Sequence, residues 1–300
     1  MKITLYGVRG SFPVPGPYTF KYGGNTSSIL IEFNEEQYLV IDAGTGIRNL
    51  GTYLLNTKKK PLNINILFTH THWDHIMGIP FFAPIYEGDS IINMYGPESS
   101  KEQTLKDIIL SQLEHKYFPV SVHEIGANIN EVQLSETTFN IFDAKICTIR
   151  LNHPCITLGY RIEYKDKVVV TVYDHEPFDN FFADDSQAQT LHGKLSKSEI
   201  LGLNQKIIDF CENADYLIID SQYTKKEYLT SKKGYGHSYF EYSLALGIKS
   251  NSRSIILFHH DPCRTDFQLD YIDKVLKNYI KENGYNIETI LAKEGLILDL

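Results

Sequence analysis

The chain has 300 residues, of which 42% are hydrophobic, 22% charged and 12% aromatic. This mixture is typical of a globular protein and excludes a disordered or fibrous one. The 29 Lys and Arg residues are outnumbered by 37 Asp and Glu residues, and the resulting formal charge of −8 disfavours a protein that wraps a large nucleic acid.

Runs rich in Ile, Val and Leu recur along the chain and predict strands, several of them buried on both faces. Examples, in chain order, are 28–33, 37–41, 64–68, 90–95, 145–151, 167–173, 216–219 and 254–258. Apolar residues at helical spacing predict helices over 46–55, 99–115, 198–213, 239–248 and 266–282. Because strands and helices alternate throughout, we expect an α/β layered architecture in a single domain, residues 1–300.

Sequence signals for export or membrane insertion are missing. The stretch Met1–Gly7 has no apolar run long enough for a signal peptide, and no run of about 18 apolar residues occurs in the chain. The four cysteines, Cys147, Cys155, Cys211 and Cys263, form no CxxC pair. We therefore expect reduced thiols, a cytoplasmic location and no membrane partner.

The most informative segment follows the predicted strand 64–68. Three imidazoles, His70, His72 and His75, and the carboxylate of Asp74 lie within six positions of one another. In a tight turn after a strand, alternating side chains converge on neighbouring points. This donor set suits two divalent cations, with Zn²⁺ as the first choice and Mn²⁺ as the alternative.

This segment resembles the HxHxDH signature of metallo-β-lactamase-fold hydrolases, whose fold is a four-layer αββα sandwich. Further motifs of that family follow in the expected order. His153 stands at the place of the family's later lone ligand, and Asp174 at that of the metal-bridging Asp. The final ligand falls at His259, with its neighbour His260 as the alternative.

The resemblance implies a specific set of metal ligands. One ion would be held by His70, His72, His153 and Asp174, and the other by Asp74, His75, Asp174 and His259. Asp74 would also orient the attacking water. Asp42, in a DxGxG turn, is expected behind the ligands, where it fixes an imidazole through its outer N–H. The alternative for Asp42 is a turn-capping carboxylate.

The chain further resembles the phosphodiesterase branch of that family, which contains the tRNA 3′-processing endonuclease Z. Asp220 stands at the acidic position of the branch's HEAT motif, and His237 and Ser238 match its HST motif, with Tyr239 in place of Thr. His237 is then expected to bind a phosphoryl oxygen beside Ser238 and to protonate the leaving oxygen, with its pKa raised by Asp220. The alternative is an ordinary loop histidine beside a strand-end carboxylate.

The residues 7–16 and 22–27 are similar to a bacterial and phage group of this fold that includes cyclic-nucleotide phosphodiesterases, some of which degrade cyclic-nucleotide immune signals. We therefore expect a homodimeric enzyme that opens 3′,5′-cyclic nucleotides to nucleoside monophosphates. The acidic charge and the lack of a Gly/Pro/Lys-rich insertion make nucleic acid a less favoured partner than a small phosphodiester. The alternatives are a tRNA 3′-processing endoribonuclease, a non-catalytic nucleotide-binding module, and a hydrolase of non-phosphate esters.

Aromatic residues flank the motifs, and some of them are candidates to stack on a nucleobase. Phe12, Trp73 and Tyr235 are among them. The alternative for any one of these rings is packing in the core or within a loop.

Overall fold

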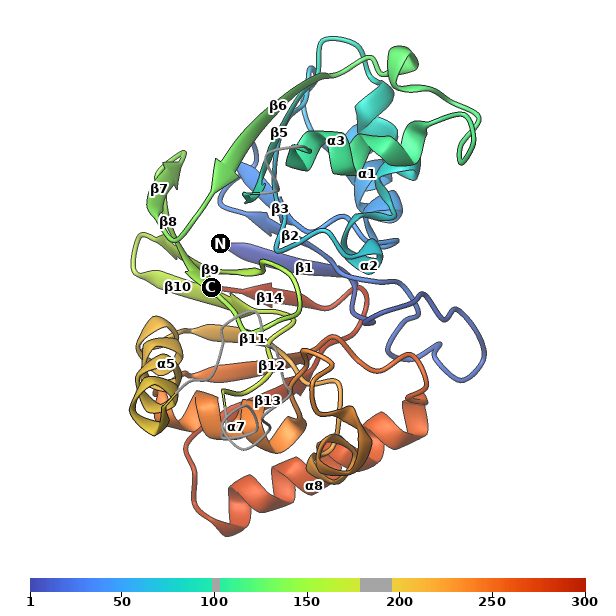
Figure 1. Ribbon diagram of the computed structural model, residues 1–300. Helices are drawn as coiled ribbons and strands as arrows, with labels where there is room; N and C mark the ends of the chain where they lie inside the picture. Colours follow the sequence, from blue (N-terminus) through green and yellow to red (C-terminus); the bar gives the residue numbers. More distant parts are fainter. Residues whose placement is uncertain (99–102, 179–195) are drawn as a thin grey trace.

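The computed structural model describes residues 1–98, 103–178 and 196–300, and it contains two seven-stranded sheets packed face to face (Figure 1). The strand order of the first sheet is β14 (Ile297–Asp299), β1 (Lys2–Gly7), β2 (Ser28–Glu32), β3 (Tyr38–Ile41), β4 (Asn63–Leu67), β5 (Ile91–Pro97) and β6 (Asn128–Leu134). The order of the second is β13 (Glu288–Leu291), β12 (Ser254–Phe258), β11 (Tyr216–Asp220), β10 (Lys167–Val172), β9 (Leu158–Tyr164), β8 (Ala144–Arg150) and β7 (Thr138–Ile141).

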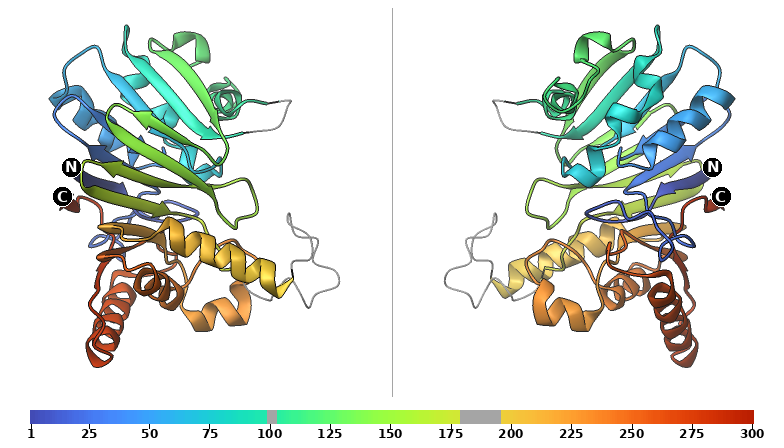
Figure 2. Two further views of the ribbon diagram at one scale, coloured as in Figure 1. Left: turned by 90° about the vertical axis from the view of Figure 1, so that its left-hand side faces the viewer. Right: turned by 90° about the vertical axis from the view of Figure 1, so that its right-hand side faces the viewer.

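Helices cover the outer face of each sheet, as the two side views show (Figure 2). The first sheet carries α1 (Ile47–Thr57), α2 (Trp73–Ile76) and α3 (Leu105–Leu110), and the second carries α5 (Lys197–Phe210), α7 (Phe240–Lys249) and α8 (Asp266–Glu282). The described residues also form short helical turns: Ile79–Phe81, Ala83–Tyr86, Ser111–Leu113, Val122–Glu124, α6 (Lys225–Glu227) and Tyr228–Lys232. This four-layer αββα sandwich confirms the predicted fold class.

The continuous apolar runs of the sequence come from strands that are buried on both faces. In β2, Ile29 and Ile31 enter the core between the sheets, whereas Leu30 packs under the helices of the first sheet. In β12, Ile256 and Phe258 face the same central core, and the alternate residues pack under α7 and α8. Because successive side chains of a strand point to opposite faces, both sets must be apolar in a four-layer fold.

Most predicted elements are observed within one or two residues, and α8 occupies the predicted range of 266–282. The predicted helix over 99–115 differs, and its residues 99–102 lie outside the described part of the chain. Its described part forms α3 from Leu105 because Thr104 caps the helix: the Thr104 hydroxyl accepts a hydrogen bond from the Asp107 amide, and the Asp107 carboxylate accepts one from the Thr104 amide.

Each sheet has a parallel part, and these two parts place the functional residues. The strands β3, β4, β5 and β6 run parallel in the first sheet, as do β10, β11, β12 and β13 in the second. All four cysteines are free thiols. Among the described residues, no helix is both long and apolar enough to cross a membrane.

Candidate metal centre

The candidate site lies where parallel strands of both sheets end at their carboxyl termini. The residues that meet there follow β3, β4, β10, β11 and β12 and include Asp42, His70, His72, Asp74, His75, Asp174, Asp220 and His259. Binding sites of α/β sheets are commonly built at these strand ends, because the loops that leave them converge there.

Sharp turns of the backbone bring three of these side chains to one place. Asp42, Asp174 and His259 have positive φ angles of 58°, 43° and 60°, and Asp42 and His259 come directly after their strands. A left-handed backbone costs a residue other than glycine about 1–3 kcal/mol, and such strain gathers at functional sites. Asp174 and His259, which follow strands of the second sheet, both reach His75 after β4 of the first sheet, whereas Asp42 contacts His75 and Thr69 from the neighbouring strand of the same sheet.

The first group of ligand-type residues is called here the histidine cluster: His70, His72, His153 and Cys155, whose ligand atoms lie within 4.8 Å of one another. His153 Nε2 lies 3.0 Å from His72 Nδ1, while His153 Nδ1 is 2.8 Å from the carbonyl oxygen of Gly236. His70 Nδ1 lies 3.0 Å from the Thr69 hydroxyl. These outer contacts leave Nε2 of both His70 and His153 turned toward the cluster.

Burial keeps the imidazoles of the histidine cluster neutral. It lowers the pKa of His70 well below its ordinary value and that of His153 to about 3, and it also lowers the pKa of His72. In each case burial outweighs the opposing effect of the Asp174 carboxylate. Neutral imidazole is the form that binds a metal ion, so these residues are ready to act as ligands.

The second group is called here the carboxylate cluster: Asp74, His75, Asp174 and His259, all buried, with ligand atoms within 4.8 Å of one another. Nε2 of His259 lies 3.2 Å from both Asp74 Oδ2 and Asp174 Oδ1, and Nε2 of His75 lies 3.3 Å from the same two oxygens. The other Asp174 oxygen lies 3.5 Å from Nε2 of His70, in the histidine cluster. Asp174 therefore faces both clusters.

Residues behind the carboxylate cluster fix its members. Asp42 Oδ2 lies 2.7 Å from His75 Nδ1, and the amide of Ser11 donates to Asp74 Oδ2 over 2.7 Å. Burial alone lowers the pKa of His75, but the carboxylates of Asp174, Asp74 and Asp42 raise it well above its ordinary value. The carboxylates of this cluster therefore create a negative potential that favours a bound cation.

Two buried atoms test whether a metal ion fits these residues. Nε2 of His70 and Oδ1 of Asp174 are shielded from solvent, yet neither has a hydrogen-bond partner. Buried polar atoms are nearly always satisfied, so two such ligand atoms at the centre of a His/Asp group call for an explanation. A set of imidazole and carboxylate donors is the kind that holds divalent metal ions, and the residues fit them.

His237 and Asp220 form a third feature, beside the two clusters. His237 Nδ1 lies 2.8 Å from Asp220 Oδ2 and 4.0 Å from Asp174 Oδ2. Burial lowers the pKa of His237, but Asp220 and then Asp174 raise it, so that the net pKa is about 9. A protonated imidazole that is oriented by a buried carboxylate can donate a proton to a neighbouring group.

The remaining predicted residues lie close by but face other partners. Ser238 is fully buried, and its hydroxyl donates to the carbonyl oxygen of His175 rather than facing the clusters. His260 points away from the clusters, with its Nε2 at 2.8 Å from the carbonyl oxygen of Ala292. Of the two adjacent histidines, the structure thus brings His259 and not His260 to the carboxylate cluster.

One buried carboxylate that supports this site was not predicted from the sequence. Glu176 is 3% exposed and accepts hydrogen bonds from the amides of Gly234 and Gly236 and from the hydroxyl of Tyr228, at 2.7, 2.8 and 2.9 Å. It thereby holds the loop that carries the His153 acceptor and His237. Its position two residues after Asp174 could have marked it as a residue of the site. Its role could not be predicted, because the amides that it binds lie 58 and 60 residues further along the chain.

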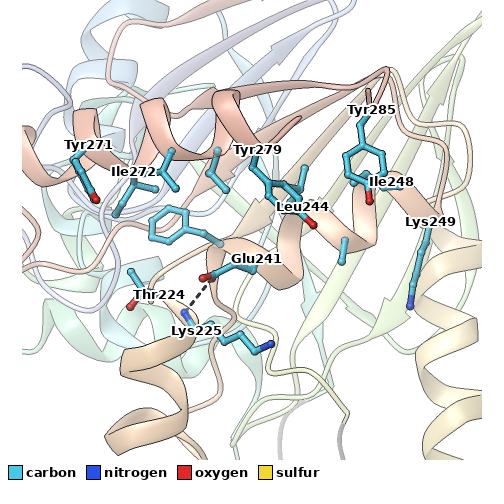
Figure 3. A pocket seen from close by; sticks show the side chains of 14 residues that line it. Thr224, Lys225, Glu241, Leu244, Ile248, Lys249, Tyr271, Ile272, Tyr279 and Tyr285 are labelled. Atoms are coloured by element: carbon cyan, nitrogen blue, oxygen red, sulfur yellow. Dashed lines mark hydrogen bonds between the residues drawn. The ribbon is translucent and has the colours of Figure 1, made fainter. Parts of the chain in front are cut away.

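An apolar surface cavity lies elsewhere, between α7 and α8 (Figure 3). Its volume is about 620 Å³, and Leu244, Ile248, Tyr271 and Tyr279 are among its lining residues. Glu241 at its rim accepts a hydrogen bond from the Lys225 amide. None of the cluster residues lines it, so this cavity is separate from the candidate metal centre.

Comparisons with known proteins agree with this geometry. Residues 37–188, just over half of the chain, match the family described as "Beta-lactamase superfamily domain". The chain belongs to this superfamily. Ribonuclease Z of Oceanobacillus iheyensis is 26% identical to the chain over 286 residues, which cover 84% of this chain and 88% of that protein.

Solved structures support the fold in the same way. The metallo-β-lactamase fold protein YhfI from Bacillus subtilis superposes with a TM-score of 0.65 at 18% identity, over 99% of this chain and 98% of that one. Human tRNase Z, short form, superposes with a TM-score of 0.62 at 17% identity over 100% of this chain and 99% of that one. Both predictions, the fold and the resemblance to the phosphodiesterase branch of this superfamily, are confirmed. The chain is thus similar to metal-dependent hydrolases of that phosphodiesterase type.

Proposed function

We propose that this superfamily member is a dinuclear metallophosphodiesterase that hydrolyses 3′,5′-cyclic nucleotides to nucleoside monophosphates. The observation that carries the proposal is the sharing of Asp174 between the two clusters, beside the His237–Asp220 pair. A phosphodiester needs both an activated water and a proton for the leaving oxygen, and this arrangement offers residues for each task.

In this proposal His70, His72, His153 and Asp174 hold one ion, and Asp74, His75, Asp174 and His259 hold the other. Zn²⁺ is the first choice because imidazole nitrogens dominate the donor set, and Mn²⁺ is the alternative. When bound, two divalent ions lower the pKa of a water molecule and neutralise phosphate oxygens. The chain itself supplies the orientation of the ligands, through Asp42, Thr69 and the carbonyl of Gly236.

His237 is the proposed general acid. Its Nδ1 is tied to Asp220, so Nε2 is the atom that would bind a phosphoryl oxygen and protonate the leaving oxygen of the ribose. Asp220 accepts a further hydrogen bond from the Gln222 amide over 3.1 Å, which fixes its orientation. Asp74, held by the Ser11 amide, orients the attacking water. We assign Ser238 the role of positioning the loop, because its hydroxyl is occupied by His175.

Exposed aromatic rings next to the site residues favour a nucleotide over other phosphodiesters. Trp73, between His72 and Asp74, is 76% exposed, and Tyr235, two residues before His237, is 57% exposed. Phe12 follows Ser11 and is 62% exposed. Stacking of a base on such a ring contributes about 1–3 kcal/mol to binding, so exposed rings at these positions can add to the affinity for a nucleotide.

Relatives named Ribonuclease Z favour a second candidate, the processing of tRNA 3′ ends. Both candidates use the same clusters and the same acid, and they differ in the size and charge of the substrate. The formal charge of −8 favours the small cyclic phosphodiester, because a tRNA would meet an acidic protein surface.

A substrate panel separates the candidates. The purified chain is loaded with Zn²⁺ or Mn²⁺ and incubated with 3′,5′-cyclic nucleotides of each base and with a 3′-extended precursor tRNA. Nucleoside monophosphate as the product is expected. Cleavage of the precursor tRNA alone would replace the first candidate by the second, and turnover of neither, with tight nucleotide binding, would leave a binding module.

A further inference from the structure

Cys155 is the one member of the histidine cluster that the expected ligand set does not include. Its sulfur lies within 4.8 Å of a ligand atom of each of the three histidines, His70, His72 and His153. The side chain is half-buried, and its contact with the Thr157 hydroxyl is long, at 3.8 Å. Proximity to three imidazoles is notable because neutral histidines and a thiolate together form a frequent zinc donor set.

A second observation points to a ligand at the same place. His70 is completely buried, and its Nε2, which is turned into the histidine cluster, has no hydrogen-bond partner. The nearest oxygen of Asp174 lies 3.5 Å from this atom, and the same oxygen lies 3.6 Å from Nε2 of His153. The cluster therefore has room for an ion whose remaining ligand comes either from Asp174 or from the sulfur.

The backbone around Cys155 keeps the thiol at this position. Pro154 lies between His153 and Cys155, and Gly236, with φ of 85°, packs so closely on His153 and Pro154 that no side chain would fit. His153 Nδ1 is held by the carbonyl of Gly236. These contacts hold His153 and Pro154, and the sulfur of the next residue, Cys155, lies beside the three imidazoles.

We propose that Cys155 is a sulfur ligand of the ion in the histidine cluster and makes that cluster selective for Zn²⁺ over Mn²⁺. The inference rests on the dinuclear centre of the proposed function. As the S–Zn bond forms, the thiol releases its proton to solvent, so the ligand is a thiolate. Thiolate is a soft donor that favours Zn²⁺, whereas Mn²⁺ prefers carboxylate and water. The carboxylate cluster has no sulfur and keeps its tolerance for Mn²⁺.

Cobalt substitution tests this assignment without measuring turnover. Co²⁺ bound by a thiolate gives a sulfur-to-metal charge-transfer absorption in the near-ultraviolet, which is absent from Co²⁺ bound by nitrogen and oxygen only. The full chain loaded with Co²⁺ is expected to show this band. Cys155→Ser is expected to lose the band and at least about tenfold in Zn²⁺ affinity, while its Mn²⁺ affinity stays the same. Cys147→Ser, at another half-buried cysteine, is the matched control and keeps both.

Alkylation provides a measurement on the unmodified chain, in case the serine variant does not fold. Zn²⁺ is expected to slow the reaction of Cys155 with iodoacetamide at least tenfold, as followed by peptide mass spectrometry. The exposed Cys263 serves as the internal control and reacts at the same rate with and without the ion. Equal rates for Cys155 in both states would overturn the assignment.

The outcomes separate this inference from the proposed function. Co²⁺ that binds without the sulfur band shows that Cys155 is not a ligand, while the metal centre of His and Asp residues stands. Failure of the chain to bind Co²⁺ or Zn²⁺ at all overturns the dinuclear centre and the role of Cys155 together. Retention of the band in Cys155→Ser assigns the sulfur signal to another cysteine and overturns the inference alone.

Discussion

The histidine cluster and the carboxylate cluster lie side by side and share Asp174, but they are built from different chemistry. The first has three imidazoles whose pKa values are lowered, chiefly by burial. The second has two buried carboxylates, with a third, Asp42, directly behind His75. Neutral imidazole donors favour the metal ions that prefer nitrogen ligands. Buried carboxylates are costly without a positive charge beside them, and any cation or protonated histidine can supply that charge. The difference predicts that variants of the two clusters have separable effects.

The largest effect is expected where the two clusters meet. Asp174→Ala removes the carboxylate that faces both, so we expect loss of both ions and a rate at least about 10⁴-fold lower. Metal content after dialysis, by atomic emission, and the initial rate check this. Asp166→Ala, at an exposed carboxylate, is the control. Two ions retained in Asp174→Ala would show that the clusters are independent.

A pair of variants tests whether each cluster holds its own ion. His72→Ala is expected to lose the ion of the histidine cluster alone, and His259→Ala that of the carboxylate cluster alone. Each would lower the rate about 10³-fold, since one ion supplies several kcal/mol of charge stabilisation. The measurement is metal content per chain, with the exposed His123→Ala as the control. If both variants lose both ions, the distinction between the clusters breaks down.

His237→Ala should separate proton donation from metal binding. We expect both ions to remain and the rate to fall about 10²- to 10³-fold, within the usual contribution of a general acid. His237 acts as the acid only while it is protonated, so the wild-type rate should decline as the pH rises toward its pKa of about 9. Bound cations would move this decline to lower pH.

The pH profile of kcat decides this prediction. The alkaline decline should be absent from His237→Ala and should move to lower pH in Asp220→Asn, because the neutral amide no longer raises the pKa of His237. A His237→Ala variant that keeps the wild-type rate and profile would show that the leaving oxygen is protonated by another group.

The smallest effect is expected for a substitution of Asp42, which contacts the proposed ligand His75 from behind. Asp42→Asn removes the charge that orients His75, and Zn²⁺ affinity of the carboxylate cluster should fall about 10- to 100-fold. The affinity of the histidine cluster should stay unchanged, and a titration with a chromophoric chelator resolves the two. Equal weakening of both would mean that Asp42 supports the whole turn rather than one ligand.

The sequence predicted most reliably what depends on local pattern. Strands such as β2 and β12 were found because both of their faces are apolar. The strands β1, β6, β7, β9, β13 and β14 were not among those named from the sequence. In β6 most residues are exposed or half-buried, so its apolar signal is weak and its place in the sheet comes from pairing with β5. Such pairing joins segments far apart in the chain, and no local pattern reports it.

The same division holds for the site. The histidines and aspartates proposed as ligands were recognised by motif spacing, and the structure brings all seven together. The contributions of Ser11 and Glu176 were not recognised, because each acts through contacts with backbone amides. Ser11 meets Asp74 across 63 residues of sequence, so only the folded chain shows the contact.

Gly236 links the candidate metal centre to the proposed proton donor. Its carbonyl oxygen holds the imidazole of His153, and the residue that follows it is His237. Any change that shifts this peptide therefore moves the proposed metal ligand His153 and the proposed acid His237 at the same time. An attempt to adapt the enzyme to a larger substrate by rebuilding this loop would alter its metal occupancy as well, so redesign should begin on the outer rings, Trp73 and Phe12, which face solvent.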